Sequence, residues 1–193
     1  MSHRLFLVVI GFALTTNTPA MAQDRSCSAF TSSPAASIAF LEEQVDVRQS
    51  PCITTVIRQL GRAHSSDAVP VLIRYLDFVD PATFPKPDGF ADRRPEYPSI
   101  EALFLTGKVA TTSLLSAIQN SESPVIRGNA AKVYEAVYRD ELALGIHILR
   151  VSEMGTSAEP QNRLREVSET LAQDCTHRTE DEARMCKKAA DGK

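Results

Sequence analysis

Residues 51–77, PCITTVIRQLGRAHSSDAVPVLIRYLD, decide the fold, because they read as two amphipathic helices joined by a short polar turn. Apolar residues recur in each half at the i, i+3, i+4 and i+7 spacing of one helix face. They are Ile53, Val56, Ile57 and Leu60 in the first half, and Ala68, Leu72, Tyr75, Leu76 and Val79 from the second onward. Such a pair leaves apolar edges uncovered, so it needs similar neighbours on either side. The stretch therefore predicts one unit of a helical stack.

The ends of these two helices are marked by residues with special backbone preferences. Gly61 tolerates left-handed geometry and is expected to stop the first helix. Ser66 or Asp67 can cap the second helix, and Pro70 falls in its first turn, where its missing N–H costs little.

The segment LGRAHSSDAVPVLIRYL, residues 60–76, resembles the pattern of HEAT-like repeats, in which LG and a polar turn precede A-V-P-x-L-I-x-x-L. The likeness is greatest to the short bacterial repeats related to those of phycobilisome lyases. The resemblance implies a short right-handed α-solenoid. It also implies a binding scaffold, because HEAT-like repeats commonly present surfaces to other proteins.

The rest of the chain predicts further helices, and no segment alternates for long enough to form a half-buried strand. We therefore predict an all-α fold of about three helix pairs with capping helices. The expected pairs lie at 51–77, 100–118 and 124–150, and the capping helices at 37–45, 160–171 and 183–190. The segment ELALGIHILR, residues 141–150, is apolar on most sides and is expected to be the most buried helix. Thr179 and Glu182 have the spacing of a capping box before the last helix.

The first 22 residues read as an export signal with a positive start, an apolar run from Leu5 to Leu14, and a small-residue cleavage site at Ala20-Met21-Ala22. This predicts a periplasmic or secreted protein. The mature part, residues 23–193, is expected to form one domain with a disordered tail after about residue 190. No later apolar run exceeds that of the signal, so no membrane span is expected in the mature chain.

The charge balance argues against a nucleic-acid partner. Lys and Arg number 21 against 24 acidic residues, and they are scattered among acids rather than gathered in a basic stripe. A basic amphipathic segment for a membrane surface is also missing from the sequence.

The four cysteines, Cys27, Cys52, Cys175 and Cys186, are an even number in an exported chain, which favours disulfides. Three pairings are possible. We prefer Cys27 with Cys52 and Cys175 with Cys186, because each would tie a terminal segment to the adjacent helix. A metal site at Cys175, His177 and Cys186 is the alternative, although it lacks a fourth ligand at recognisable spacing.

Residues 80–98 form a proline-rich insert that no helix can cross, and a long irregular segment in a compact domain is usually functional or mobile. It is the candidate partner-binding surface. Its candidate residues are Phe84, Asp88, Phe90, Asp92, Arg93, Arg94 and Tyr97. The two arginines, flanked by aromatic rings, are suited to grip an acidic partner. Two alternatives are a calcium or acid/base role for Asp88 and Asp92, and a loop whose aromatics fold back on the stack.

Catalytic motifs are absent from the sequence, and the histidines left after signal removal, His64, His147 and His177, have no evident catalytic partners. We therefore predict no enzymatic activity and no cofactor. The leading hypothesis is an exported, noncatalytic interaction or scaffold module whose partner is another exported or cell-envelope protein. The alternative is an envelope enzyme accessory or lyase-like factor that uses the 80–98 insert.

Overall fold

The computed structural model describes residues 27–81, 97–153 and 157–191, and every regular element in these ranges is a helix. The prediction of an all-α fold is therefore confirmed for this part of the chain. The α-helices are α2 (Pro34–Gln44), α3 (Ile53–Arg62), α4 (Val69–Arg74), α5 (Pro98–Thr106), α6 (Thr111–Asn120), α7 (Pro124–Val137), α8 (Leu142–Glu153), α9 (Ala158–Cys175) and α10 (Glu180–Ala190). The short 3-10 helices η1 (Ser66–Ala68) and η2 (Gly107–Ala110) precede α4 and α6. The predicted signal peptide, residues 1–22, lies outside the described residues.

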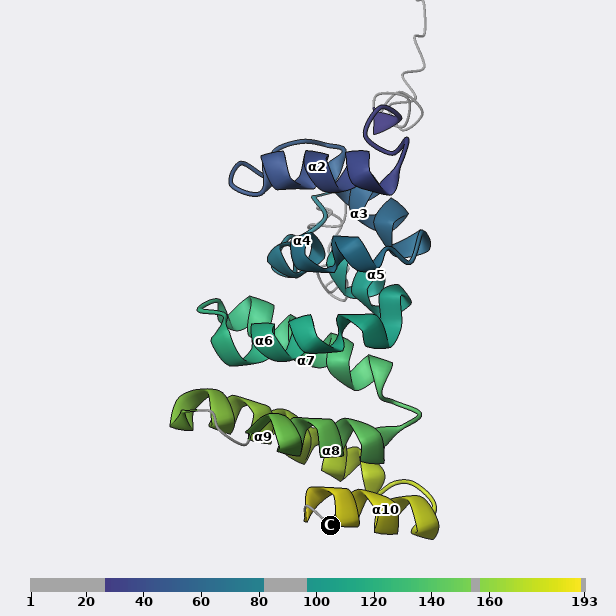
Figure 1. Ribbon diagram of the computed structural model, residues 1–193, viewed down its shortest axis with the longest axis vertical. Coiled ribbons are helices and arrows are strands. Elements are labelled where there is room, and N and C mark those ends of the chain that lie inside the picture. Colours follow the sequence, from purple (N-terminus) through teal and green to yellow (C-terminus); the bar gives the residue numbers. More distant parts are fainter. Residues whose placement is uncertain (1–26, 82–96, 154–156, 192–193) are drawn as a thin grey trace, which may run out of the picture.

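The helices follow one another along the long axis of the molecule, from α2 at one end to α10 at the other (Figure 1). Helix α3 packs most extensively on α5, α6 on α7, and α8 on α9. The predicted apolar stripe of residues 53–60 lies in α3 and is fully buried. A continuous core of Leu, Ile, Val, Ala and Tyr side chains runs through the stack.

Gly61 lies inside α3 and permits close packing against α5. A methyl group added at Gly61 would lie 2.6 Å from the Ala102 Cα atom and 2.9 Å from its Cβ atom. Carbon atoms do not approach one another so closely, so only glycine lets the two helices cross at this distance. The prediction that Gly61 ends the helix through left-handed geometry is therefore wrong.

The left-handed residue at the end of α3 is His64, with φ of 48°. The exposed imidazole contacts the neighbouring helix: its Nδ1 atom lies 2.6 Å from the Leu105 carbonyl oxygen of α5. Neither Ser66 nor Asp67 caps α4, since both lie in η1 and Ala68 occupies the N-cap position. Pro70 lies in the first turn of α4, as predicted.

Each end of the stack carries a disulfide. The structure pairs Cys27 with Cys52 and Cys175 with Cys186, with Cα atoms 5.4 Å and 6.3 Å apart. This is the connectivity preferred from the sequence, and it leaves neither Cys175 nor Cys186 as a thiolate for the alternative metal site. The bridges hold the α2 and α10 ends of the stack to the helices beside them.

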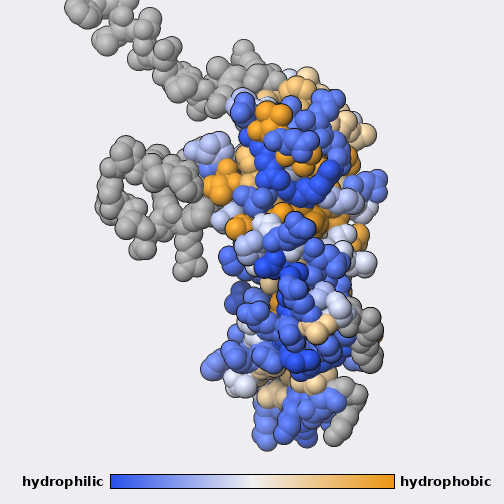
Figure 2. All heavy atoms as spheres, turned by 90° about the vertical axis from the view of Figure 1, so that its left-hand side faces the viewer, coloured by the Kyte–Doolittle hydropathy of each residue, from blue (hydrophilic) through white to orange (hydrophobic). Residues whose placement is uncertain are grey.

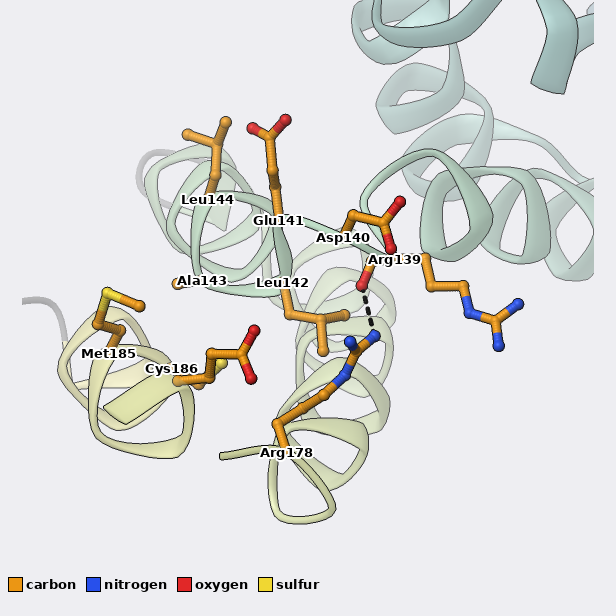
Figure 3. Close-up of a pocket in the computed structure, with 10 residues that line it drawn as sticks. Arg139, Asp140, Glu141, Leu142, Ala143, Leu144, Arg178, Met185 and Cys186 are labelled. Atoms are coloured by element: carbon orange, nitrogen blue, oxygen red, sulfur yellow. Dashed lines mark hydrogen bonds between the residues drawn. The ribbon is translucent and has the colours of Figure 1, made fainter. Parts of the chain in front are cut away.

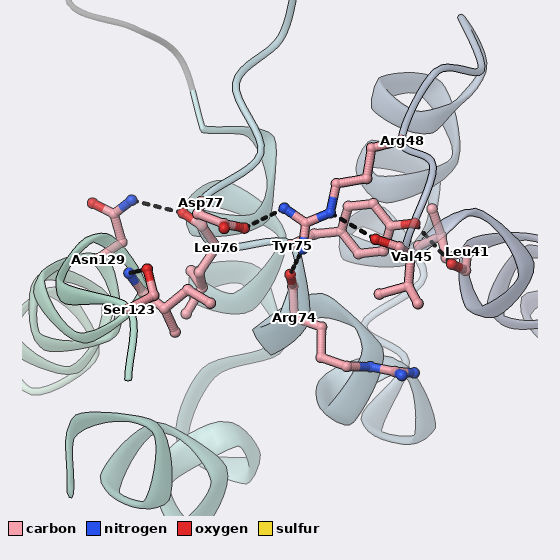
Figure 4. Close-up of polar contacts among 10 residues, drawn as sticks. Leu41, Val45, Arg48, Arg74, Tyr75, Leu76, Asp77, Ser123 and Asn129 are labelled. Carbon is pink, nitrogen blue, oxygen red and sulfur yellow. Dashed lines mark hydrogen bonds and ion pairs between the residues drawn. The ribbon is translucent and has the colours of Figure 1, made fainter. Parts of the chain in front are cut away.

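Arg48 joins α2 to α4 at the N-terminal end (Figure 4). Its guanidinium donates to the Val45 carbonyl oxygen at 2.9 Å, to the Asp77 carboxylate at 2.5 Å and to the Arg74 carbonyl oxygen at 2.7 Å. The same group lies 5.1 Å from the centre of the Tyr75 ring. Arg48 has a φ of 49°, so these contacts hold a backbone conformation that side chains disfavour.

We expect Arg48→Ala to lower the free energy of unfolding by about 2 kcal/mol, because several hydrogen bonds of a charged group are lost together. Arg48→Gly loses the same bonds but relaxes the left-handed backbone, so its loss should be about 1 kcal/mol smaller. Urea denaturation measures both. The control is Arg62→Ala, an exposed arginine of α3, which should change stability by less than about 0.5 kcal/mol. Equal effects at both arginines would contradict the role assigned to Arg48.

In the parts of the chain that the structure covers, no helix has both the length and the hydrophobicity needed to cross a bilayer.

Candidate functional site

The predicted partner-binding insert falls mostly outside the described residues. Phe84, Asp88, Phe90, Asp92, Arg93 and Arg94 all lie in the range 82–96, which the structure does not describe. Tyr97 is described: it is half-buried at the N-cap of α5, and its carbonyl oxygen accepts a hydrogen bond from the Ile100 N–H at 3.0 Å. The role of these residues in binding therefore stays a prediction.

Both ends of the insert are anchored in the stack. Asp80 is 4% exposed, and its carboxylate lies 3.3 Å from the Arg58 guanidinium of α3. At the other end, Pro98 is the first residue of α5 and is buried, so it belongs to the helix and not to the irregular segment. The two residues that flank the insert, Asp80 and Pro98, are thus fixed in the stack.

Helix α8 is less buried than its sequence predicts. One face packs into the core, yet Leu144 and Val151 are 42% and 47% exposed, and His147 is also exposed. The expectation that residues 141–150 form the most buried helix is wrong, because α9 and α10 cover only part of its circumference. The apolar side chains on its uncovered side therefore lie at the protein surface, where exposed apolar groups often mark contact sites.

A cleft of about 270 Å³ lies at the C-terminal end, between the start of α8 and α10. We call it the α8–α10 cleft. Figure 3 shows Met185 of α10 beside Ala143 of α8, with Leu142 pointing into the space between the helices. Met185 is 54% exposed, and methionine adapts its shape to the groups that it contacts. These three residues form an apolar wall in which Met185 is exposed, Ala143 is half-buried and Leu142 is buried.

Charged groups border this apolar wall. Arg178 lies in the turn before α10 and donates to the Arg139 carbonyl oxygen at 2.8 Å, which holds this turn against the end of α7 (Figure 3). Glu182 lines the cleft from the first turn of α10. Hydrogen bonds from the Thr179 side chain and backbone hold the pKa of the Glu182 carboxyl below its usual value, so it is ionised at neutral pH. These bonds form the capping box, which confirms that prediction.

The disulfide at this end contributes to the cleft directly. Cys186 is among the lining residues, and its bond to Cys175 fixes α10 to the end of α9. Since α10 also packs along α8, the two helices that form the cleft cannot separate without disturbing a covalently tied unit. The disulfide therefore restricts movement of α10, which forms one wall of the cleft.

The histidines are dispersed over the surface. His64, His147 and His177 are all exposed, and they lie in three different layers of the stack. Among the described residues, no group of three or more His, Cys, Asp and Glu side chains is placed to hold a metal ion.

Sequence reasoning missed the α8–α10 cleft. Its residues are separated by about forty positions, and periodicity assigns Leu142 and Met185 to two ordinary helices. One indication is present in ARMCKKAA, where Met185 stands one position from Cys186 and so cannot share its buried face. Comparisons with protein-family models, with curated proteins and with solved structures find no match for this chain.

Proposed function

We propose that this chain is an exported, noncatalytic interaction module that binds another exported or cell-envelope protein. Its helices would form a short right-handed solenoid of the HEAT-like type. The repeat-like segment 60–76 supports this proposal, together with the way in which α3 packs on α5 and α5 on α7 along the stack. The two disulfides fit an oxidising compartment, which favours the periplasm or the exterior of the cell.

The observation that carries the proposal is the α8–α10 cleft. An apolar depression that carries an exposed side chain such as Met185 is typical of a protein-binding site. A partner would insert an apolar side chain against Leu142, Ala143 and Met185, and the ionised Glu182 would accept a hydrogen bond from the neighbouring N–H or amino group of that partner. A volume of about 270 Å³ is suited to one or two anchoring side chains.

The test is site-specific crosslinking in the source organism. A photo-reactive amino acid replaces Met185 in the full-length chain, and the result expected is one discrete adduct with a partner protein. A second substitution in the same chain, Ala143→Gln, fills the cleft and should reduce that adduct at least tenfold. Since Ala143 is only partly buried and glutamine is a good helix former, the variant should keep its fold.

The matched control places the photo-reactive group at Val151. That side chain is 47% exposed on the same helix but does not line the cleft. An adduct of equal yield at Val151, or an adduct unchanged by Ala143→Gln, would rule out the cleft as the binding site.

A further inference from the structure

A second cavity lies between α7 and α9, on a different part of the molecule from the α8–α10 cleft. Its volume is about 320 Å³. We call it the α7–α9 groove. The residues on which its chemistry depends are Arg127, Gly128 and Glu135 of α7 and Arg163, Glu166 and Thr170 of α9.

One end of the α7–α9 groove is cationic and rigid. The Arg127 Nη1 atom donates to the carbonyl oxygens of Ser121 and Glu122, both at 2.9 Å. The Arg163 Nη1 atom donates to the Gln119 carbonyl oxygen at 2.7 Å, and its Nη2 atom is already paired with the carboxylate of Glu159, one turn earlier in α9. Gln119 and Ser121 belong to the last turn and C-cap of α6 and Glu122 follows in the turn, so the end of this helix holds both guanidiniums in place.

These bonds do not use all the N–H donors of Arg127. A guanidinium carries five N–H donors in a fork that matches a carboxylate. Within the described ranges, Arg127 makes only the two bonds from Nη1, so its Nη2 and Nε donors are available to a ligand. The N-terminal ends of α7 and α9 add partial positive charge at this end.

The opposite end of the groove is anionic. Glu135 follows Arg127 by eight residues, which is about 12 Å along a helix. Burial, and then the negative charge of Asp174 on α9, raise the pKa of Glu135, while Lys132 opposes the shift. Asp174 of α9 lies near Glu135 of α7, and Arg127 and Arg163 both bind the end of α6. Helices α7 and α9 therefore run in the same direction. A cation placed beside Glu135 would relieve its unfavourable surroundings.

The middle of the groove is open. A Cβ atom added at Gly128 would meet no heavy atom within 4 Å, so no neighbouring side chain requires glycine there. Glycine in a helix interior destabilises the helix relative to alanine. The empty space above the Gly128 backbone allows the main chain of a ligand to approach closely. In Figure 1 both helices begin on the left-hand side, which is the face shown in Figure 2, and the lower half of that face is mostly hydrophilic.

We propose that the α7–α9 groove binds the carboxyl-terminal end of an extended peptide. Arg127, with its available Nη2 and Nε donors, would hold the terminal carboxylate beside Arg163, and Glu135 would hold a lysine or arginine side chain three or four residues before it. An extended chain rises about 3.3 Å per residue, so this spacing matches the separation of the two charged ends. The proposal goes beyond the function assigned to the α8–α10 cleft and does not depend on it.

The experiment uses the mature chain, residues 23–193, and a fluorescein-labelled peptide that ends in lysine followed by three alanines. Fluorescence anisotropy should show saturable binding of the peptide acid. The peptide amide, and a peptide with alanine in place of lysine, should each bind at least tenfold more weakly. A peptide with an internal aspartate in place of the terminal carboxylate should also bind weakly, and equal binding of this peptide or of the amide would overturn the proposal.

Protein variants separate the groove from the cleft. Gly128→Gln fills the groove and should abolish peptide binding while leaving the melting temperature unchanged or higher. Glu135→Gln should weaken binding of the lysine peptide at least fivefold and leave the weaker binding of the alanine peptide unchanged. Met185→Asp, in the α8–α10 cleft, should bind the peptide as the parent protein does. Absence of binding by the parent protein at 1 mM peptide, or full binding by Gly128→Gln, would refute the assignment.

Discussion

Replacing Gly61 with alanine is expected to lower the free energy of unfolding by about 2–3 kcal/mol, although the change adds a single methyl group. The new Cβ atom would lie 2.6 Å from the Ala102 Cα atom, and that backbone atom cannot rotate away as a flexible side chain would. Helices α3 and α5 must therefore move apart, which loosens the buried contacts on both sides of their crossing. Thermal and urea denaturation of residues 23–193 measure the loss.

Gly128→Ala is the matched control, because it makes the same chemical change in a helix where the added methyl group meets no atom within 4 Å. It should stabilise the protein by up to about 1 kcal/mol through helix propensity alone. In the double variant Gly61→Ala/Ala102→Gly, the 2.9 Å contact between Cβ atoms disappears but the contact to the backbone remains, so recovery should be partial. If Gly61→Ala were as stable as the parent protein, the α3–α5 crossing would be wider than described.

Removing the Cys27–Cys52 disulfide, as Cys27→Ala/Cys52→Ala, should cost about 3 kcal/mol. The bond closes a segment of 25 residues, and its loss restores conformational freedom to the unfolded chain. Both cysteines are nearly fully buried, so alanine avoids placing an unpaired hydroxyl in the core. Urea denaturation under oxidising conditions should show the midpoint fall.

The Cys175–Cys186 bond closes a shorter segment of 11 residues, so its removal should cost slightly less. Dithiothreitol should lower the stability of the parent protein towards that of a variant lacking both bonds, and it should have no effect on that variant. A Cys27→Ala/Cys52→Ala variant with an unchanged midpoint would show that packing alone holds α2 in place.

The periodicity of apolar residues predicted the helices well, because each apolar face is formed by residues of a single segment. The stripe of α3 and the capping box of Thr179 and Glu182 depend on residues three or four apart, and both are found as expected. The preferred cysteine pairing could be reasoned in the same way, since each pair lies close in sequence. Features that depend on local patterns are therefore those that can be predicted most directly from the sequence.

Features that depend on the crossing of distant helices were not predictable. Gly61 follows Leu60 near a polar turn and looks like a helix stop, but its role depends on Ala102, forty-one positions later. Arg48 belongs to no local sequence pattern, and its partners Arg74 and Asp77 come after α3 in the chain. Both proposed binding surfaces are likewise formed by pairs of helices, so their residues meet only when the layers stack.

The two disulfides join the first cysteine to the second and the third to the fourth, over separations of 25 and 11 residues. If the chain enters an oxidising compartment with its N-terminus first, the first pair is complete before either cysteine of the second becomes available. Oxidation in order of appearance therefore yields the native connectivity, without the slow exchange of mispaired bonds that interleaved cysteines require. The order of the cysteines along the chain therefore favours the native disulfide pairing.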